Sequence, residues 1–455
     1  MPKINKFLTA IISLMLMAAT WFFFTTVESR LDTERNEVLE RAVVYIEHGI
    51  YDRGIAAYNQ ALRMRHDPNT LYALAHAQRE GGMYAAYRNS LQSLINGETP
   101  PADMSMADLF IEAFEHDREH ARMADIINLL RTGWQRTGDY RLHELFNTYR
   151  YAYITRRHVY DYAQPIIGGT GRVYTHGLGW GFVNADGVQM LAPQFELATN
   201  FFGNYAAVQI YNEPVEMINR VGNRQAVAGF SAYGIHSKEN GFFSARPMGV
   251  AQYGFAVRDG IQINALDATA DFIGLLNHGI RAVQLGDRWA IQDRGNRAVN
   301  IETDFIYESI AVDEIGRAAV NERIFVKQNG SYTMLDLEGN PVAGPFDAAR
   351  PFFEAGGLAA VSRNGLWGLI NNSGNMVIDF IHDEARSSGF SLVPVRQGDY
   401  WGYISIREYP ESVHHQFFGR MVIEPRFLDA KQFANGVAPV LLEQGWVYIS
   451  LIEWE

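Results

Sequence analysis

Two histidines and a glutamate have a spacing that could bind a metal ion. His116, Glu119 and His120 follow the pattern His-x-x-Glu-His. On a helix the two histidines share one face and could ligate zinc, with Glu119 as a general base. A third ligand would have to come from a large surrounding α/β domain, but the motif lies in a short stretch of helical periodicity. We therefore interpret it as a solvated helical face and predict no metal site there.

A second histidine pair lies in an insertion near the C-terminus. The segment 406–418 replaces a tight turn that comparable parts of the sequence have at this point. Loops added to a rigid scaffold often carry binding residues. We predict a contact patch for a partner, with a neutral insertion as the alternative. Its candidate residues are Tyr409, His414, His415, Phe417 and Phe418.

The remaining reactive residue types argue against catalysis. The run Gly168-Gly169-Thr170-Gly171 lacks the Lys and Ser/Thr of a phosphate loop, so we interpret it as a turn. The chain has no Cys, which excludes disulfides, thiol catalysis and Cys-ligated zinc. Its net charge of −12 disfavours nucleic acid as a partner. We predict that the protein is not an enzyme and carries no cofactor.

Internal repetition dominates the C-terminal two-thirds of the chain. Five segments share an apolar residue, then Asn, Gln or Asp, two free positions and a Gly that can adopt positive φ. This pattern predicts tight hairpin turns between short strands. The segments are 183–187, 218–222, 291–295, 335–339 and 370–374.

Trp-Gly pairs lead into several of these turns. Clear copies begin at Trp180, Trp367 and Trp401, and Pro-x-Phe elements follow downstream. Each unit closes with a Gly-x-x-Ala/Pro-Val strand, for which we assign copies at Gly279–Val283, Gly316–Val320, Gly357–Val361 and Gly436–Val440. The closing valines recur about every 38 residues, a period typical of propeller blades and other arrays. These residues resemble the WG-repeat family, whose general function is poorly defined; the resemblance covers nearly two-thirds of the chain.

The two ends of the repeat region are complementary in phase. It opens with a half-unit over 160–173 and ends with another over 444–449. Together they would complete one unit, as in a closed ring that removes its edge strands. We therefore favour a propeller-like array, and an open β solenoid is the alternative.

The stretch from about Asp32 to Tyr149 has helical periodicity. Gly49, Gly54, Tyr58 and Ala61 fall at spacings that resemble a tetratricopeptide repeat, and a weaker copy follows about 33 residues later. A small residue at Gly54 would let two helices cross closely. The resemblance implies a groove for peptides or partner proteins, whereas a plain helical spacer is the alternative.

The first 27 residues are strongly apolar. Residues 7–27 contain no charge and, at about 1.5 Å per residue, would extend about 31 Å as a helix, close to a bilayer core. Lysines precede the run and acidic residues follow it, which predicts an uncleaved anchor with the bulk of the chain outside the cell membrane. A cleaved signal peptide is the alternative.

Together these patterns predict an α+β multidomain protein. It would comprise a transmembrane anchor over 1–27, a tetratricopeptide-like helical domain over 28–150 and a WG-repeat β domain over 151–455. We predict an envelope-anchored, non-catalytic scaffold that binds protein partners. A protein that binds cell-wall glycan through repeat aromatics is the alternative.

Overall fold

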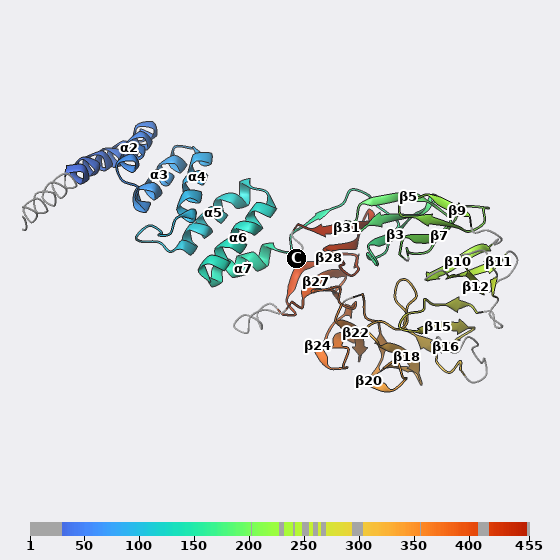
Figure 1. The fold of residues 1–455 in the computed structure, drawn as a ribbon. Coiled ribbons are helices and arrows are strands. Elements are labelled where there is room, and N and C mark those ends of the chain that lie inside the picture. Colours follow the sequence, from blue (N-terminus) through green and yellow to red (C-terminus); the bar gives the residue numbers. More distant parts are fainter. Residues whose placement is uncertain are drawn as a thin grey trace, which may run out of the picture. The chain divides into compact units, whose positions relative to one another are not determined.

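The computed structural model describes residues 30–201, 203–226, 232–239, 242–247, 254–257, 263–264, 270–293, 304–354, 356–407 and 418–452. The chain divides into two compact units, Met1–Arg150 and Tyr151–Glu455 (Figure 1). The described part of the first unit is helical, and that of the second consists of short strands.

The helical unit is a series of hairpins. Residues 30–47 are helical, and six further helices follow: α2 Tyr51–Met64, α3 Pro68–Glu80, α4 Tyr84–Asn96, α5 Met106–His120, α6 Met123–Thr137 and α7 Tyr140–Tyr149. Each helix from α2 to α6 packs against the next helix along the chain. Gly54 permits the first close crossing, because a Cβ there would lie 2.4 Å from Cδ1 of Ile46. The tetratricopeptide identity of these hairpins stays a prediction.

The predicted transmembrane helix is not supported and is corrected here. Within residues 30–452, apart from the undescribed gaps, no helix is long and apolar enough to cross a membrane. Helices α2–α7 have 10 to 15 residues, and each buries only one face. The apolar run 7–27, on which the prediction was based, lies outside the described residues.

The described residues of the second unit form eight antiparallel sheets, numbered here in chain order. Sheet 1 is β2 Tyr162–Ala163, β3 Thr170–Thr175, β4 Gly179–Asn184 and β5 Gln189–Phe195, and sheet 2 is β6 Leu197–Ala198, β7 Tyr205–Gln209, β8 Glu216–Asn219 and β9 Arg224–Ala226. Sheet 3 is β10 Ala232–Glu239, β11 Phe242–Pro247, β12 Gly254–Val257 and β13 Ile263–Asn264, and sheet 4 is β14 Phe272–Ile273, β15 Ile280–Leu285 and β16 Arg288–Asp293. Sheet 5 is β17 Ser309–Ile310, β18 Ile324–Gln328, β19 Ser331–Leu335 and β20 Pro341–Phe346, and sheet 6 is β21 Ala348–Ala349, β22 Leu358–Arg363, β23 Leu366–Asn371 and β24 Met376–His382. Sheet 7 is β25 Glu384–Ala385, β26 Leu392–Gln397, β27 Tyr400–Ser405 and β28 Met421–Phe427, and sheet 8 is β29 Asp429–Ala430, β30 Val437–Leu442, β31 Gly445–Leu451 and β1 Tyr153–Thr155.

Four of the predicted turns lie between the third and fourth strands of sheets 1, 2, 5 and 6, whereas the segment 291–295 lies partly outside the described residues. In sheet 6 the Asn371 side chain accepts hydrogen bonds from the backbone N–H groups of Ser373 and Asn375 at 3.1 and 2.9 Å. Gly374 has φ +83°, which a residue with a side chain rarely adopts. Asn184 and Asn219 repeat the arrangement in sheets 1 and 2. The sequence pattern therefore encodes one turn geometry.

The glycine of each Trp-Gly pair permits close contact between the third and fourth strands. A Cβ on Gly181 would lie 2.5 Å from the nitrogen of Pro193, and one on Gly402 would lie 2.4 Å from the oxygen of Ile423. The strand register shifts beside each glycine, as at a β-bulge. A glycine is therefore required at this position, because a side chain would collide with the backbone of the fourth strand.

Consecutive sheets pack into a ring, which confirms the propeller and excludes the open solenoid (Figure 1). Sheets 8 and 1 share a core that includes Val183, Val437 and Tyr448. The predicted half-units are wrong in detail. Residues 160–173 belong to a complete first sheet, and the strand that completes the last sheet is β1, which pairs with β31.

The assignment of a closing strand at Gly316–Val320 is also wrong. The valine of sheet 5 that matches the others is Val326, which pairs with Ile310 as Val361 pairs with Ala349. Residues 311–323 form an inserted loop between β17 and β18, here called the central loop. Its Ala-Ala-Val sequence imitates a strand, but Leu275 meets Arg317 there in a single isolated bridge.

Candidate binding site

A cation follows the first strand in three consecutive sheets. Arg350, Arg386 and Lys431 each come directly after the paired alanine of β21, β25 and β29. Each cation lies over the tryptophan ring of its own sheet: 4.9 Å from the centroid of Trp367, 5.0 Å from that of Trp401 and 5.0 Å from that of Trp446, in that order. The electrostatic attraction between each cation and the ring face helps to fix the position of the charged group.

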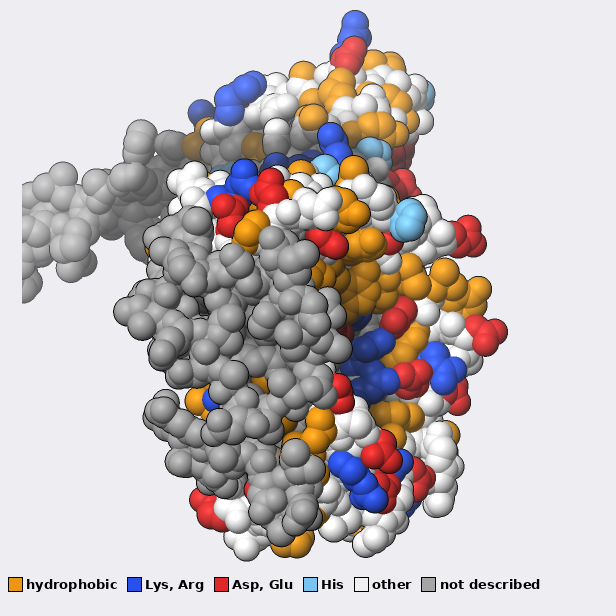
Figure 2. All heavy atoms as spheres, turned by 90° about the vertical axis from the view of Figure 1, so that its right-hand side faces the viewer, with side chains coloured by type: hydrophobic (Ala, Val, Ile, Leu, Met, Phe, Trp, Pro, Cys, Tyr) orange, Lys and Arg blue, Asp and Glu red, His pale blue; other side chains and the backbone are white. Residues whose placement is uncertain are grey.

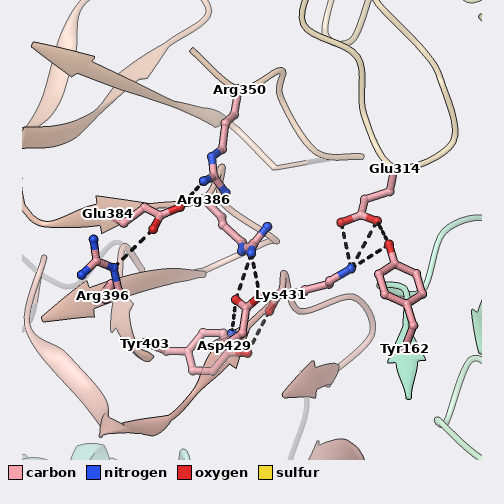
Figure 3. A network of polar contacts seen from close by, with 10 residues as sticks. Tyr162, Glu314, Arg350, Glu384, Arg386, Arg396, Tyr403, Asp429 and Lys431 are labelled. Atoms are coloured by element: carbon pink, nitrogen blue, oxygen red, sulfur yellow. Dashed lines mark hydrogen bonds and ion pairs between the residues drawn. The ribbon is translucent and has the colours of Figure 1, made fainter. Parts of the chain in front are cut away.

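Each cation also reaches a carboxylate outside its own sheet (Figure 3). Arg350 pairs with Glu384, the first residue of β25. Arg386 pairs with Asp429, the first residue of β29, at 2.9 Å. The pairs therefore form a ladder in which the cation of one sheet binds the acid that begins the next.

Ring closure changes the ladder at Lys431. The residue that begins β2 is Tyr162, which is not an acid, and the carboxylate comes instead from Glu314 of the central loop. Lys431 Nζ lies 3.1 Å from Glu314 Oε1, and the Tyr162 hydroxyl donates to Glu314 Oε2 at 2.7 Å (Figure 3). Burial alone would raise the pKa of Glu314, but Lys431 and Tyr162 outweigh it and hold that pKa below its ordinary value. Burial and the Glu314 charge raise the pKa of Tyr162.

The central loop is held in place by its own ion pairs. Asp313 binds Arg317 at 2.6 Å, and Arg317 binds Glu354 of sheet 6 at 2.9 Å. Gln164 donates to the backbone oxygen of Glu314 at 3.0 Å. The loop thus connects sheet 5 to sheets 1, 6 and 8, and it fixes the position of the Glu314 carboxylate.

A hollow of about 440 Å³ adjoins this network in sheet 1. It is lined by Tyr162, Gln164, Arg172, Tyr174, Trp180 and Glu314. Three aromatic rings, a cation and an acid therefore surround one space. We take this hollow as the candidate binding site.

Arg172 is the cation of sheet 1, and it comes from β3. Its guanidinium lies 4.7 Å from the Trp180 ring centroid, as in the other three sheets. Its Nε donates to Gln164 Oε1 at 3.0 Å, and its Nη1 donates to the backbone oxygen of Ala198. Burial lowers the pKa of Arg172 to about 10, so the side chain remains charged at neutral pH.

The structure places the first histidine pair on α5, where His120 is exposed and the His116 side chain is largely buried. The rings of His116 and His120 stack at 5.2 Å on α5, and His116 Nδ1 lies 3.1 Å from Asp117 Oδ1. Among the described residues no group of three or more potential ligands could hold a metal ion.

The predicted contact patch lies mostly outside the residues that the structure describes. Tyr409, His414, His415 and Phe417 lie outside the described residues. Phe418 is described, and it packs against the apolar core between sheets 6 and 7.

Sequence reasoning missed Arg172, Glu314 and Lys431. A partial signal was available, because Ala-Arg or Ala-Lys follows the turn elements three times, at Ala349, Ala385 and Ala430. Their partners could not be read from the sequence, because each pair joins different sheets.

Comparison with known proteins identifies the repeats. A model of the WG containing repeat matches residues 180–213, 334–367, 367–401 and 418–446. No curated protein matches the chain.

Solved structures resemble the chain only loosely. The computationally designed Ika8 protein has 10% identity and a TM-score of 0.38, over 66% of this chain and 98% of that one. Hsv2 of Kluyveromyces lactis has 12% identity and a TM-score of 0.33, over 55% of this chain and 94% of its own. These values carry no argument about function.

Proposed function

This chain carries WG repeats, and from that premise we propose that it is a non-catalytic scaffold whose propeller binds protein partners. The ladder supports this reading. The charged residues that the repeats bring together are paired across sheets and stacked on tryptophan, so they stabilise the ring. A rigid ring of this kind presents its turns as binding surfaces.

The observation that carries the proposal is a set of exposed apolar residues at one end of the sheets. In an antiparallel sheet the turn from the second to the third strand lies at the same end as the connection to the next sheet. Leu178 and Tyr211 lie in such turns, and Ile381 lies at such a connection, with exposed fractions of 61%, 72% and 65%. Leu366, Tyr400 and Leu428 lie at the same end and are also exposed.

These residues define what we call the turn face. Apolar side chains that gather on one surface mark protein contact sites more often than scattered ones. The view in Figure 2 shows hydrophobic side chains between charged ones of both signs on the described surface. A mixed surface of this type suits a protein partner.

The repeat tryptophans favour the scaffold over the glycan-binding alternative. Trp401 and Trp446 are buried, and Trp180 and Trp367 are each covered by an arginine. A sugar-binding platform needs a free aromatic face.

The helical unit, which we propose as a second contact surface, presents an exposed Tyr84 near the stacked rings of His116 and His120.

Affinity capture with three forms of the full chain tests the proposal. The test variant carries Leu178→Ser, Tyr211→Ser and Ile381→Ser, and the control carries Val221→Ser, an exposed apolar residue at the other end of sheet 2. Quantitative mass spectrometry should find proteins bound equally by the wild type and the control and depleted at least fivefold with the test variant. Equal recovery with all three forms would exclude the turn face as the contact surface.

A further inference from the structure

Among the four cations that stack on a tryptophan ring of the described sheets, Arg172 is the exception. The other three, Arg350, Arg386 and Lys431, each have a carboxylate partner. Within the described residues, no carboxylate lies at ion-pair distance from Arg172, and its Nη2 makes no hydrogen bond. Its hydrogen-bond partners, Gln164 and Ala198, are neutral, and a largely buried charge without an opposite charge in contact costs free energy, so this arrangement calls for an explanation.

The reason lies at the start of the next sheet. The ladder requires an acid as the first residue of the following sheet, as in Glu384 and Asp429. Sheet 2 begins with Leu197 instead. In sheet 1 the residue directly after the paired Ala163 is Gln164, and Arg172 of β3 supplies the stacked cation instead, while the acid that would neutralise it is missing.

Arg172 also lines the open hollow. The acid that lines this hollow is Glu314, and its two carboxylate oxygens already accept hydrogen bonds from Lys431 and Tyr162. Arg172 and Lys431 together carry two positive charges against the one negative charge of Glu314, which leaves this group with a net positive charge. An added anion would be repelled by Glu314 and attracted by Arg172 and Lys431. The sum of these electrostatic interactions favours a negative group in the hollow.

The aromatic walls could instead suggest a site for a cationic ligand, since a cation binds well over Trp or Tyr. Arg172 already occupies the face of Trp180. A second cation would be repelled by it, and the nearby Glu314 is neutralised. The hollow is therefore better suited to an anion that has an apolar neighbour.

We propose that the hollow beside Arg172 binds a carboxylate of a partner polypeptide. This inference rests on the proposed function and specifies the chemistry of the partner. The guanidinium geometry matches a carboxylate, and Tyr174 and Trp180 can contact the apolar atoms beside it. Tyr174 and Trp180 pair one step before the turn that carries Leu178, so the hollow lies next to the turn face.

Arrays of synthetic decapeptides test the proposal directly on the purified full chain. The first array has free C-terminal carboxylates and no Asp or Glu, the second has amidated termini and one Asp or Glu, and the third is amidated without any acid. Wild-type protein should bind peptides of the first or second array and not the third. The array that binds identifies a terminal or a side-chain carboxylate.

Two variants and one control complete the design. Arg172→Gln should lower binding to the positive array at least tenfold. Leu197→Glu restores the acid of the ladder, so it should block binding and also raise the melting temperature. Arg220→Gln is the control, because Arg220 stacks on Phe201 at 5.2 Å outside the hollow and should leave binding unchanged.

Leu197→Glu keeps the test decisive if Arg172→Gln does not fold. Binding of the acid-free array at the same level, or unchanged binding by the variants that fold, would overturn the proposal. The result is independent of the capture experiment, since purified protein and synthetic peptides are used. If the turn-face variant lost its captured partners, this result alone would not predict a change in peptide binding to the arrays.

Discussion

At the scale of single residues, the repeats use small side chains where backbones meet and acids where turns need a hydrogen-bond acceptor. The Trp-Gly pair combines two such requirements. The tryptophan provides a face for a cation, while the glycine lets the fourth strand approach. This explains why the two residues recur together, although they perform different tasks.

Replacement of Gly402 by Ala should destabilise the propeller. The new Cβ would lie 2.4 Å from the backbone oxygen of Ile423, which cannot move without breaking the pairing of β27 and β28. Overpacking of this kind costs about 1–3 kcal/mol. Gly357→Ala is the control, because no atom lies within 4 Å of its Cβ position. Urea denaturation should show a lower midpoint for Gly402→Ala alone, and equal midpoints would refute the packing argument.

An acid before the first strand holds the turn of its own sheet. Asp347 Oδ2 accepts from the N–H of Asn364 at 2.6 Å, and Asp383 Oδ2 accepts from that of Gly398 at 2.7 Å. Asp161 and Asp271 do the same in sheets 1 and 4. In sheet 8 the matching residue is the exposed Leu428, so that turn lacks this hydrogen bond.

Asp383→Ala should therefore cost about 1 kcal/mol of unfolding free energy, the value of one side-chain cap. Leu428→Ala is the matched control at the same repeat position and should have little effect, because Leu428 is exposed and caps nothing. Thermal denaturation of both variants measures the difference. A similar loss for both would mean that the acid does not act through the turn.

At the scale of elements, sequence patterns predicted the strands better than their partners. The turn segment at Asn371 and the Trp-Gly pair at Trp367 have local causes, so both were readable. The central loop was misread because Ala318-Ala319-Val320 has the composition of a closing strand, and only pairing with β17 distinguishes Val326. The site depends on Arg172, Glu314 and Lys431, which come from two sheets and the central loop and lie near one another only after the ring closes.

The central loop should stabilise the ring through Glu314. Glu314→Gln leaves Lys431 buried without its carboxylate, and breaking a buried ion pair costs about 3 kcal/mol at neutral pH. Glu322→Gln is the control, because it makes the same change at an exposed position in the same loop. Guanidinium denaturation at pH 7 should separate the two variants.

The same pair predicts a pH dependence. The pKa of Glu314 in the folded state lies below its ordinary value of 4.5. Its stabilisation is therefore fully present above pH 4.5 and is lost as the pH falls through the folded-state pKa. The stability difference between the wild type and Glu314→Gln should shrink as the pH falls below 4.5 and through the folded-state pKa of Glu314. A difference that stays constant over this range would show that the Glu314 charge contributes nothing.

At the scale of the whole molecule, the ring is closed by two devices far apart in the sequence. β1 comes before the first complete sheet and adds the outermost strand to the last one. The Tyr448 hydroxyl donates to the backbone oxygen of Gln164 at 2.6 Å, which joins sheet 8 to sheet 1. Both devices hold the first and last sheets of the ring together.

Proline substitutions in β1 test its part in closure. In the antiparallel ladder, Ile154 faces Ser450 as a hydrogen-bonded pair, since Ile452 donates to Ala152 and Arg156 donates to Tyr448. Ile154→Pro removes a ladder donor, and we expect a loss of about 2 kcal/mol.

Thr155→Pro is the control, because the N–H of residue 155 points away from β31 and proline is tolerated at such edge positions. Both variants fix φ in the same way, so the comparison isolates the hydrogen bond. Differential scanning calorimetry should show one cooperative transition for the β unit, lowered by Ile154→Pro and nearly unchanged by Thr155→Pro. If Ile154→Pro melted like the wild type, β1 would be a dispensable addition and the contact between sheets 8 and 1 would close the ring alone.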